Sequence, residues 1–391
     1  MIKTTPIWIV IPTYWGSTSE ALYDHPTPLH AKSTLNRLLR SLENQKGAPP
    51  LNILILLATV SPDDEKPAVA RVTEIISPYL DHFTTHLVTP RITDWLAKEL
   101  EGEIPRLLQN ALTMKGYGAV RTCQLFIPAL YGAEIIIALD DDETVPEDYC
   151  ARAVSYIGTD HGSKQILGIS GPYVDGTGNP YLDEPEKTLN NFGEKAVLIN
   201  ETTRMLLHSP DPINITPMAF GGNMVFHHEL FHRVSFDPVI PRGEDIDYLI
   251  NAKIAGFPFF FDRDLSITHL PPREFETSSY AKMKQDVIRF MYEREKILHG
   301  NLTFEEFMPY PGALLKEDFT SLAKEALALI GSSQNFTEYG KPDEIIADAR
   351  RFAHVNLPSY FEFTEQWPNV IPLILKQTAL LKSLYWEMAI A

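Results

Sequence analysis

The sequence predicts an α/β protein in which a mostly parallel sheet is flanked by helices. Three largely apolar runs carry this prediction, at residues 7–11, 51–60 and 135–139. Short runs that do not alternate with polar residues are typical of strands buried on both faces of a parallel sheet. Segments with helical spacing lie between the runs, as expected of β–α–β units. From residue 279 onward the pattern is helical only, so we expect a helical C-terminal extension.

The N-terminal elements can be placed from the spacing of apolar residues and from the positions of proline and of helix-capping residues. The first strand stops at Pro12, and Thr13 and Tyr14 begin the loop that follows. The segment 33–42 carries leucines at helical spacing, and Ser33 or Thr34 precedes them as a cap. The other elements expected before residue 140 are a strand at 51–60, a helix at 67–80, a strand at 84–88, a helical stretch at 91–112, a helix that opens within 115–121 and continues to about 130, and the strand at 135–139.

The second half of the chain mixes strands with glycine-marked breaks. A strand at 218–226 is interrupted by Gly221 and Gly222, which indicates a bulge or the close approach of a ligand. A helix starts near residue 244 and is ended by Gly256. The other elements expected here are strands at 166–174 and 257–261, a loop at 175–193, and helices at 280–298, 314–330, 343–354 and 368–390.

Composition excludes several classes of partner. The 391 residues carry a net charge of −17 without a block of Lys and Arg, which argues against nucleic acid or an anionic membrane surface. No apolar run approaches the roughly 20 residues that a membrane helix needs. Only Cys123 and Cys150 are present, which argues against a disulfide scaffold. The N-terminus does not read as a signal peptide, so we expect a protein without an integral membrane segment, in the cytoplasm.

A cluster of acids follows the strand at 135–139, where open α/β sheets bind ligands. If the chain stays extended, Asp140 and Asp142 point to one face and Asp141 points away. Two carboxylates held this close are stable if one takes a proton or a cation lies between them. Oxygen ligands suit Mg²⁺ or Mn²⁺, which often bind substrate phosphates as well. The alternative is a solvated acidic turn.

Weaker signals have structural alternatives beside the functional ones. Gly116 and Gly118 precede a helix whose N-terminus could hold an anion, but they also suit a plain loop. His227 and His228 could bind a metal, but they also suit a polar junction between a strand and a helix. The acids at 244–247 suit any first helical turn on dipole grounds.

The order of these motifs resembles that of glycosyltransferases with the A-type nucleotide-sugar fold (GT-A, Rossmann-like), most closely those similar to family 2. The run Leu-Asp-Asp-Asp at 139–142, a form of the DXD motif, and Gly-Glu-Asp at 243–245 are its most specific parts. The resemblance covers about residues 6–272. It implies a catalytic GT-A domain at 1–278 and a helical extension at 279–391 that lies on the acceptor side or forms an oligomer interface.

The resemblance also implies roles for individual residues. Pro12, Thr13 and Tyr14 would line the nucleotide base, and Asp63 or Asp64 would contact base or ribose, although the usual Asp-Asp-Gly-Ser pattern is replaced here by Ser61-Pro62. Lys115 and Arg121 would face the donor phosphates. The other implied donor-binding residues are Asp140, Asp141, Gly221, Gly222 and Asn223; the implied metal ligands are Asp142, Asp140 and His269; and the implied catalytic residues are Asp245 as base and Glu244 as the group that orients the acceptor.

The implied reaction is the metal-dependent transfer of a sugar, such as a hexose, from a UDP- or GDP-sugar to a hydroxyl of a small sugar or other acceptor. Inversion of configuration is favoured, with Asp245 acting by position and by a pKa that burial beside Glu244 raises. The alternatives are a retaining GT-A enzyme on a small soluble acceptor and a domain that binds sugar nucleotides without catalysis. A nucleotidyltransferase is disfavoured because a basic glycine-rich loop does not follow the first strand.

Overall fold

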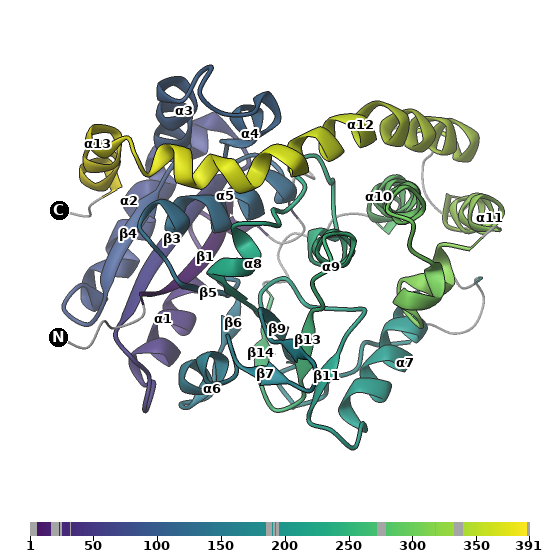
Figure 1. Ribbon diagram of the computed structural model, residues 1–391, viewed down its shortest axis with the longest axis horizontal. Helices are drawn as coiled ribbons and strands as arrows, with labels where there is room; N and C mark the ends of the chain where they lie inside the picture. The colour runs from purple at the N-terminus through teal and green to yellow at the C-terminus, as the bar shows by residue number, and fades with distance from the viewer. Residues whose placement is uncertain are drawn as a thin grey trace.

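A computed structural model places the predicted strands in one large sheet with helices on both faces (Figure 1). It describes residues 6–16, 23, 26–31, 33–184, 190, 192, 195–271, 279–316, 318–331 and 339–388. The expected division at residue 278 falls in 272–278, outside the described residues. Among the described helices, none is long and apolar enough to cross a membrane.

The large sheet is mostly parallel, as predicted. Its strand order is β11-β13-β9-β12-β5-β1-β3-β4, with β2 added to β1, and β5, β1, β3 and β4 form a parallel block. Strand β12 enters antiparallel between β5 and β9. The bounds are β1 Ile7–Gly16, β2 Thr27–Pro28, β3 Leu51–Thr59, β4 Thr84–Val88, β5 Ile135–Ala138, β9 Gly168–Ser170, β11 Ile213–Ile215, β12 Met224–His227 and β13 Phe260–Asp262.

Two smaller sheets complete the strands. The order β10-β14-β6 brings the end of β14 beside the acidic segment, with His269 in register with Glu143. A short hairpin pairs β7 with β8. The bounds are β6 Glu143–Thr144, β7 Asp160–His161, β8 Lys164–Gln165, β10 Tyr173–Val174 and β14 Ile267–His269.

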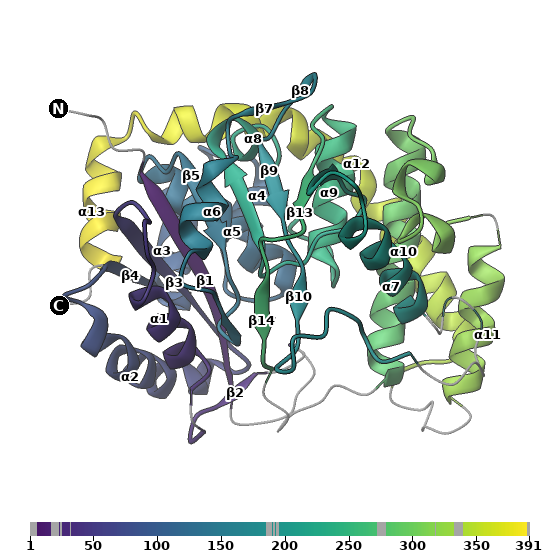
Figure 2. The same cartoon turned by 90° about the horizontal axis from the view of Figure 1, so that it is seen from below.

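Helices cover both faces of the large sheet (Figure 1, Figure 2). Ile7, Ile9 and Ile11 pack in one core with α1, α2 and α6, whereas Trp8 and Val10 pack in the other with α5 and the C-terminal helices. The bounds are α1 Leu35–Glu43, α2 Glu65–Ile76, α3 Pro90–Glu99, α4 Arg106–Ala111, α5 Tyr117–Leu130, α6 Tyr149–Ser155, α7 Lys195–Leu207, α8 His228–Phe231, α9 Glu244–Ile254, α10 Ser279–His299, α11 Phe319–Gly331, α12 Pro342–Ile374 and α13 Thr378–Met388.

In two places the sequence predicted that an element would end near a proline, and the structure shows that it continues. Strand β1 does not stop at Pro12 but pairs with β3 as far as Trp15 and Thr59. The pairing of β1 with β5 ends at Val10, so the missing N–H of Pro12 faces a side where no ladder bond is made. The helices predicted at 343–354 and 368–390 are instead the long α12, which runs through Pro358 and Pro368, followed by α13. The buried seam of α12 continues past both prolines, and Trp367 Nε1 donates to the Phe231 carbonyl at 2.9 Å.

A buried ion cluster fastens α10 to α9. The Lys296 side chain is fully buried, and its Nζ lies 2.6 Å from Asp237 and 2.7 Å from Asp247. The ammonium also lies over the Tyr360 ring, 3.7 Å from its centroid. Buried charges are tolerated only when they are paired in this way. The core therefore continues from the sheet domain into the segment after residue 278.

We expect Lys296→Met to lower the free energy of unfolding by about 3–5 kcal/mol, because it leaves two buried carboxylates without their cation. The measurement is a denaturant titration. Lys46→Met is the matched control, since Lys46 is 72% exposed and pairs only with the exposed Glu147. A loss of less than about 1 kcal/mol in Lys296→Met would contradict a fastening role for the cluster.

Candidate active site

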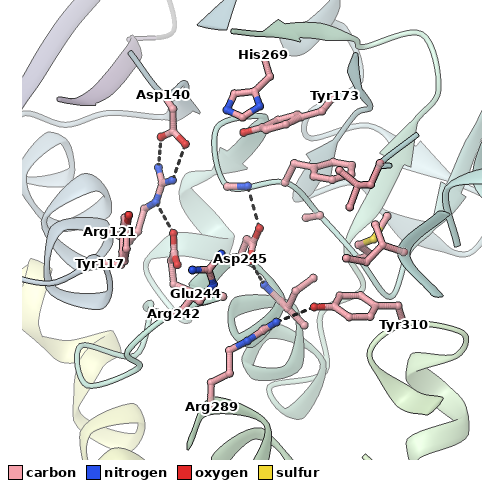
Figure 3. A pocket seen from close by; sticks show the side chains of 18 of the residues that line it. Tyr117, Arg121, Asp140, Tyr173, Arg242, Glu244, Asp245, His269, Arg289 and Tyr310 are labelled. Atoms are coloured by element: carbon pink, nitrogen blue, oxygen red, sulfur yellow. Dashed lines mark hydrogen bonds and ion pairs between the residues drawn. The ribbon is translucent and has the colours of Figure 1, made fainter. Parts of the chain in front are cut away.

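A cavity of about 420 Å³ opens where β1 and β5 end, at the sheet edge predicted for the site (Figure 3). Its walls come from both halves of the chain. The residues that line it are Tyr14, Tyr117, Arg121, Asp140, Asp141, Asp142, Tyr173, Leu182, Lys195, Ile199, Met218, Ala219, Phe220, Gly221, Arg242, Gly243, Glu244, Asp245, Ile246, His269, Arg289 and Tyr310.

The acidic segment is a turn and not an extended strand. Strand β5 ends at Ala138, and the Glu143 N–H bonds back to the Asp140 carbonyl at 3.3 Å. The expectation that Asp141 points away from its neighbours is therefore wrong, since Asp140, Asp141 and Asp142 all line the cavity. Alternation of faces holds only in an extended chain, and here the chain reverses to enter β6.

Asp140 is held by an arginine from α5. Arg121 is 3% exposed, and its guanidinium bridges Asp140, at 2.8 Å, and Glu244, at 3.1 Å (Figure 3). Gly221 packs against this guanidinium. The Arg121 charge thus joins the acidic turn to the start of α9 across the cavity.

Asp142 and His269 form the pair that best fits a divalent cation. The His269 Nε2 lies 3.3 Å from the Asp142 Oδ2, and the backbone N–H of Leu270 donates to the Asp142 carbonyl at 2.9 Å. Burial alone would lower the pKa of His269, but the bond to Asp142 raises it. A proton and a metal would therefore compete for this imidazole.

Charge repulsion within the turn supports the same fit. Burial, followed by the charge of Asp142, raises the pKa of Asp141 to about 8. Burial likewise raises the pKa of Asp140, although Arg121 opposes it. A cation would relieve this repulsion. Two protein ligands with room for phosphate oxygens are typical of Mg²⁺ or Mn²⁺ sites. Asp140 was also predicted as a metal ligand, but its carboxylate is engaged by Arg121.

The glycine pair at 221–222 brings backbone close to the acids. The Gly222 N–H donates to the Tyr173 hydroxyl at 2.6 Å, and a Cβ on Gly222 would lie 1.9 Å from the Glu143 Oε1. The centroid of the Tyr173 ring lies 4.6 Å from that of the Phe220 ring and 5.1 Å from that of the His269 ring. Gly222 therefore supports the wall from behind, whereas Gly221 lines the cavity.

Asp245 lies in the middle of the cavity, near the N-terminus of α9 (Figure 3). Its Oδ2 accepts the Gly221 N–H at 3.2 Å, and its Oδ1 accepts the Ile246 N–H at 2.8 Å. Burial, and next the charge of Glu244, raises the pKa of Asp245 to about 6. Both causes are those expected from the sequence. At neutral pH the group is mostly ionised, yet more basic than an ordinary carboxylate.

Several predicted site residues lie outside the cavity wall. Thr13 is fully buried and donates to Asp141 at 2.5 Å, so it positions an acid, while its neighbour Tyr14 lines the cavity. Asn223 is also fully buried, where it accepts from the Tyr149 hydroxyl and donates to the Leu265 carbonyl. The predicted donor-binding residues that do not line the cavity are Pro12, Thr13, Asp63, Lys115, Gly222 and Asn223. Of these, Asp63 and Lys115 are exposed.

Sequence reasoning missed a group of cavity residues from three later segments. Lys195 is at the start of α7, Arg242 precedes α9, and Arg289 lies on α10, where it donates to the Tyr310 hydroxyl at 2.7 Å. One local sequence signal could have pointed to this group, namely the glycine that directly precedes the acidic first turn of α9. Gly243 has a φ of +67°, and a Cβ there would lie 2.0 Å from the Arg289 Nη1.

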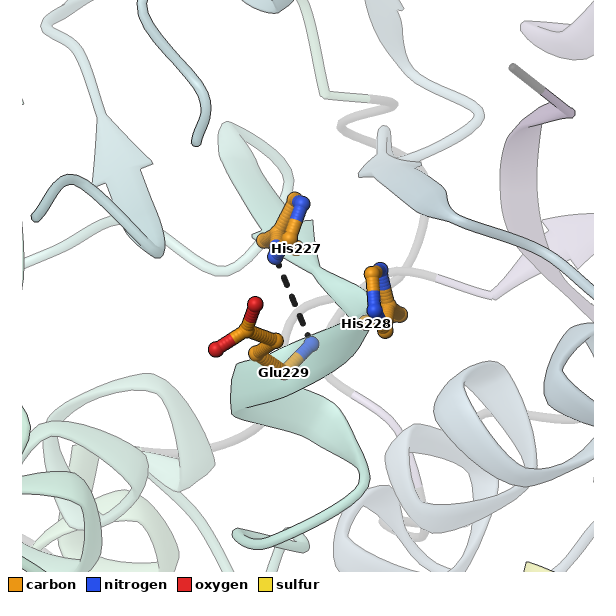
Figure 4. A group of neighbouring side chains, drawn as sticks. All are labelled: His227, His228 and Glu229. Carbon is orange, nitrogen blue, oxygen red and sulfur yellow. Dashed lines mark hydrogen bonds between the residues drawn. The ribbon is translucent and has the colours of Figure 1, made fainter. Parts of the chain in front are cut away.

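A second group of potential metal ligands lies at the other end of β5 (Figure 4). Among the described residues, His227, His228 and Glu229 bring three ligand atoms within 4.8 Å of one another. His227 caps α8, and its Nδ1 accepts the Glu229 N–H at 3.4 Å. This supports the interpretation of the histidines as a strand-to-helix junction.

No known protein-family model matches the chain, and no curated protein matches it in sequence. Solved structures do resemble it. One is a mannosyltransferase, PcManGT from Pyrobaculum calidifontis, in complex with GDP-Man and Mn²⁺. The alignment covers 95% of this chain and 88% of the mannosyltransferase chain, at 15% sequence identity and a TM-score of 0.48. GalNAc-T7 with UDP, GalNAc and Mn²⁺ aligns with 92% of this chain and 58% of its own at 13% identity and a TM-score of 0.45.

The S. aureus protein TarS aligns with 94% of this chain and 55% of its own, at 12% identity and a TM-score of 0.39. Likeness at this level does not establish a shared function.

Proposed function

We propose that the protein is a glycosyltransferase that uses a divalent metal ion and a nucleotide-diphosphate sugar, and that it inverts configuration with Asp245 as base. The observation that carries the proposal is that one cavity contains the Asp142–His269 pair and, apart from it, a carboxylate with a pKa of about 6. The first suits a metal-bound diphosphate, and the second suits proton removal from a hydroxyl.

The donor end is formed by Tyr14, the acidic turn and His269. The Tyr14 ring packs 4.4 Å from that of Tyr23 and lines the cavity, where it could stack on a base. Asp142 and His269 would hold Mg²⁺ or Mn²⁺, and Arg121, which lines the same cavity, would face the phosphates. A bound metal ion would stabilise the charge that grows on the leaving nucleoside diphosphate.

Asp245 would act on the acceptor. Its carboxylate is oriented by two backbone N–H groups, which leaves further lone pairs for an acceptor hydroxyl. In the transfer, the acceptor oxygen bonds to the anomeric carbon and its proton passes to Asp245. The bond from the anomeric carbon to the phosphate oxygen breaks, and its electron pair leaves with the nucleoside diphosphate. Glu244, paired with Arg121, would help to orient the acceptor.

The donor class can be found by thermal stabilisation. The purified chain is melted with UDP, GDP and their common sugars, each with and without Mn²⁺. A ligand at about 100 times its Kd should stabilise the fold by about 2.7 kcal/mol. We expect one nucleotide series to stabilise it only when Mn²⁺ is present. Failure of every nucleotide to stabilise the protein would contradict the proposal.

We expect an acid limb near pH 6 in the kcat/KM profile. The base is active when ionised, so the rate should fall as pH drops through the pKa of Asp245. Since the charge of Glu244 helps to raise that pKa, Glu244→Gln should move the limb to lower pH, whatever it does to the maximal rate. A limb that stays in place in Glu244→Gln would assign it to another group.

Two alternatives stay open. A retaining mechanism would show itself by the configuration of the product, and a domain that binds sugar nucleotides without catalysis would form no product. A cytoplasmic location and a homo-oligomer stay predictions from the sequence.

A further inference from the structure

The junction of β12 and α8 brings three potential metal ligands together (Figure 4). Each of His227, His228 and Glu229 offers a ligand atom within 4.8 Å of those of the other two, and all three residues are half-buried. His227 is in register with Ile135 at the start of β5, whereas the cavity lies beyond Ala138 at the end of that strand. The group is therefore separate from the candidate active site, and none of the three residues lines the cavity.

The His227 ring has the orientation and the tautomer that a metal at its Nδ1 requires. Its Nδ1 accepts the Glu229 N–H at 3.4 Å, which is long for a hydrogen bond. A neutral ring that accepts through Nδ1 carries its proton on Nε2, and in this form Nδ1 can bind a metal. The backbone of Gly158 packs at the Nε2 edge, since a Cβ there would lie 3.4 Å from Nε2. Nδ1 therefore faces Glu229 and can exchange its weak hydrogen bond for a metal ion.

The neighbouring His228 ring has a buried nitrogen in need of a partner. Its Nδ1 makes no hydrogen bond to any residue that the structure describes. The centroid of the ring lies 4.3 Å from that of the His227 ring. Buried polar atoms in proteins are nearly always paired, and a metal ion is one partner that an imidazole nitrogen accepts. The junction thus gathers imidazole nitrogens beyond the one that caps α8.

We propose that His227, His228 and Glu229 form a second metal site, which binds a divalent transition-metal ion of the Zn²⁺ type. Two imidazoles and one carboxylate are a known ligand set for Zn²⁺, with water in the remaining position. Nitrogen ligands favour such ions, whereas the oxygen ligands of the acidic turn suit Mg²⁺ or Mn²⁺. A bound ion would hold the end of β12 against the start of α8, so its role is structural. The inference does not depend on the proposed glycosyltransferase function.

The test measures Zn²⁺ binding to the full chain in which both proposed cavity ligands are replaced, Asp142→Ala with His269→Ala. The protein is treated with a chelator and dialysed, and Zn²⁺ is then titrated in competition with a chromophoric chelator. We expect one Zn²⁺ per chain, which excess Mg²⁺ does not displace, and a higher Tm with Zn²⁺ than without it. The same titration of the wild type in excess Mg²⁺ checks the result without any substitution. Absence of Zn²⁺ binding in both proteins would overturn the proposal.

Substitutions at the junction locate the ion. His228→Gln and Glu229→Gln should each weaken Zn²⁺ binding by at least about 100-fold, since the loss of an outer partner of a metal ligand alone costs about 10- to 100-fold. His82→Gln and Glu74→Gln are the matched controls, because these side chains are 52% and 69% exposed and form ion pairs on the surface, with Glu43 and with Arg71. Both controls should bind Zn²⁺ as the wild type does.

The fold of each variant is checked by its melting transition without metal. Stabilisation by the nucleotide donor with Mn²⁺ should be unchanged in His228→Gln and Glu229→Gln, because neither residue lines the cavity. Zn²⁺ binding that persists at wild-type affinity in both variants would overturn the assignment to this junction. A loss of Zn²⁺ binding that is equal in the His82→Gln control would do the same.

Discussion

Asp245→Asn is expected to lower the rate of transfer by about 10²- to 10⁴-fold, the contribution typical of a positioned general base. Asparagine keeps the shape of the side chain and can still accept the Gly221 N–H. It cannot take the acceptor proton. Donor binding should be unchanged, because Asp245 lies apart from His269, the residue that pairs with Asp142 (Figure 3). The measurement is steady-state transfer together with thermal stabilisation by the donor and Mn²⁺.

The control for this variant is Asp94→Asn, at an exposed position on α3. It should match the wild type in both assays. Loss of donor affinity in Asp245→Asn would mean that Asp245 belongs to the donor site, and transfer within about threefold of the wild type would rule it out as the base.

Asp142→Ala is expected to abolish the metal-dependent part of donor stabilisation, which is about 2.7 kcal/mol for a donor at 100 times its Kd. The variant removes one of the two residues that would hold the metal. It also removes a charge that raises the pKa of Asp141, which offsets the lost contact with His269, so the protein without ligand should keep most of its stability. Loss of donor response together with retained stability is a signature that general misfolding would not give.

His269→Ala should weaken the same response, since His269 contacts Asp142 at 3.3 Å. Asp94→Ala again serves as the control. A donor response in Asp142→Ala that still requires Mn²⁺ and equals that of the wild type would place the metal elsewhere.

The strand framework could be predicted from sequence because its signal is local. The run at 135–139 is apolar on both faces, and β5 is buried on both faces. The strand predicted at 84–88 coincides with β4. Proline was misleading for the opposite reason: β1 runs through Pro12 and α12 through Pro358 because neighbouring elements stabilise them, and that packing is not visible in a local window.

The candidate site divides in the same way. Asp142, Asp245 and His269 follow elements with a recognisable order, and all line the cavity. Lys195, Arg289 and Tyr310 come from α7, α10 and a later loop, and no local pattern marks a single cation as facing a cavity. Asn223 was predicted as a donor-binding residue from the family resemblance, yet its side-chain amide donates to the Leu265 carbonyl beneath the cavity wall. Local motifs thus located the acids and His269 that line the cavity, whereas the cations and Tyr310 could be placed there only by the tertiary structure.

The most direct test of inverting transfer is proton NMR of the reaction. The donor identified by melting is incubated with Mg²⁺, the enzyme and a panel of small sugar and other hydroxyl acceptors, and the anomeric signals are followed. The account predicts that the donor signal is replaced by a glycosidic signal of the opposite configuration, with the Asp245→Asn protein inactive. A product with retained configuration would contradict Asp245 as an inverting base, and the absence of any product would contradict the transferase itself.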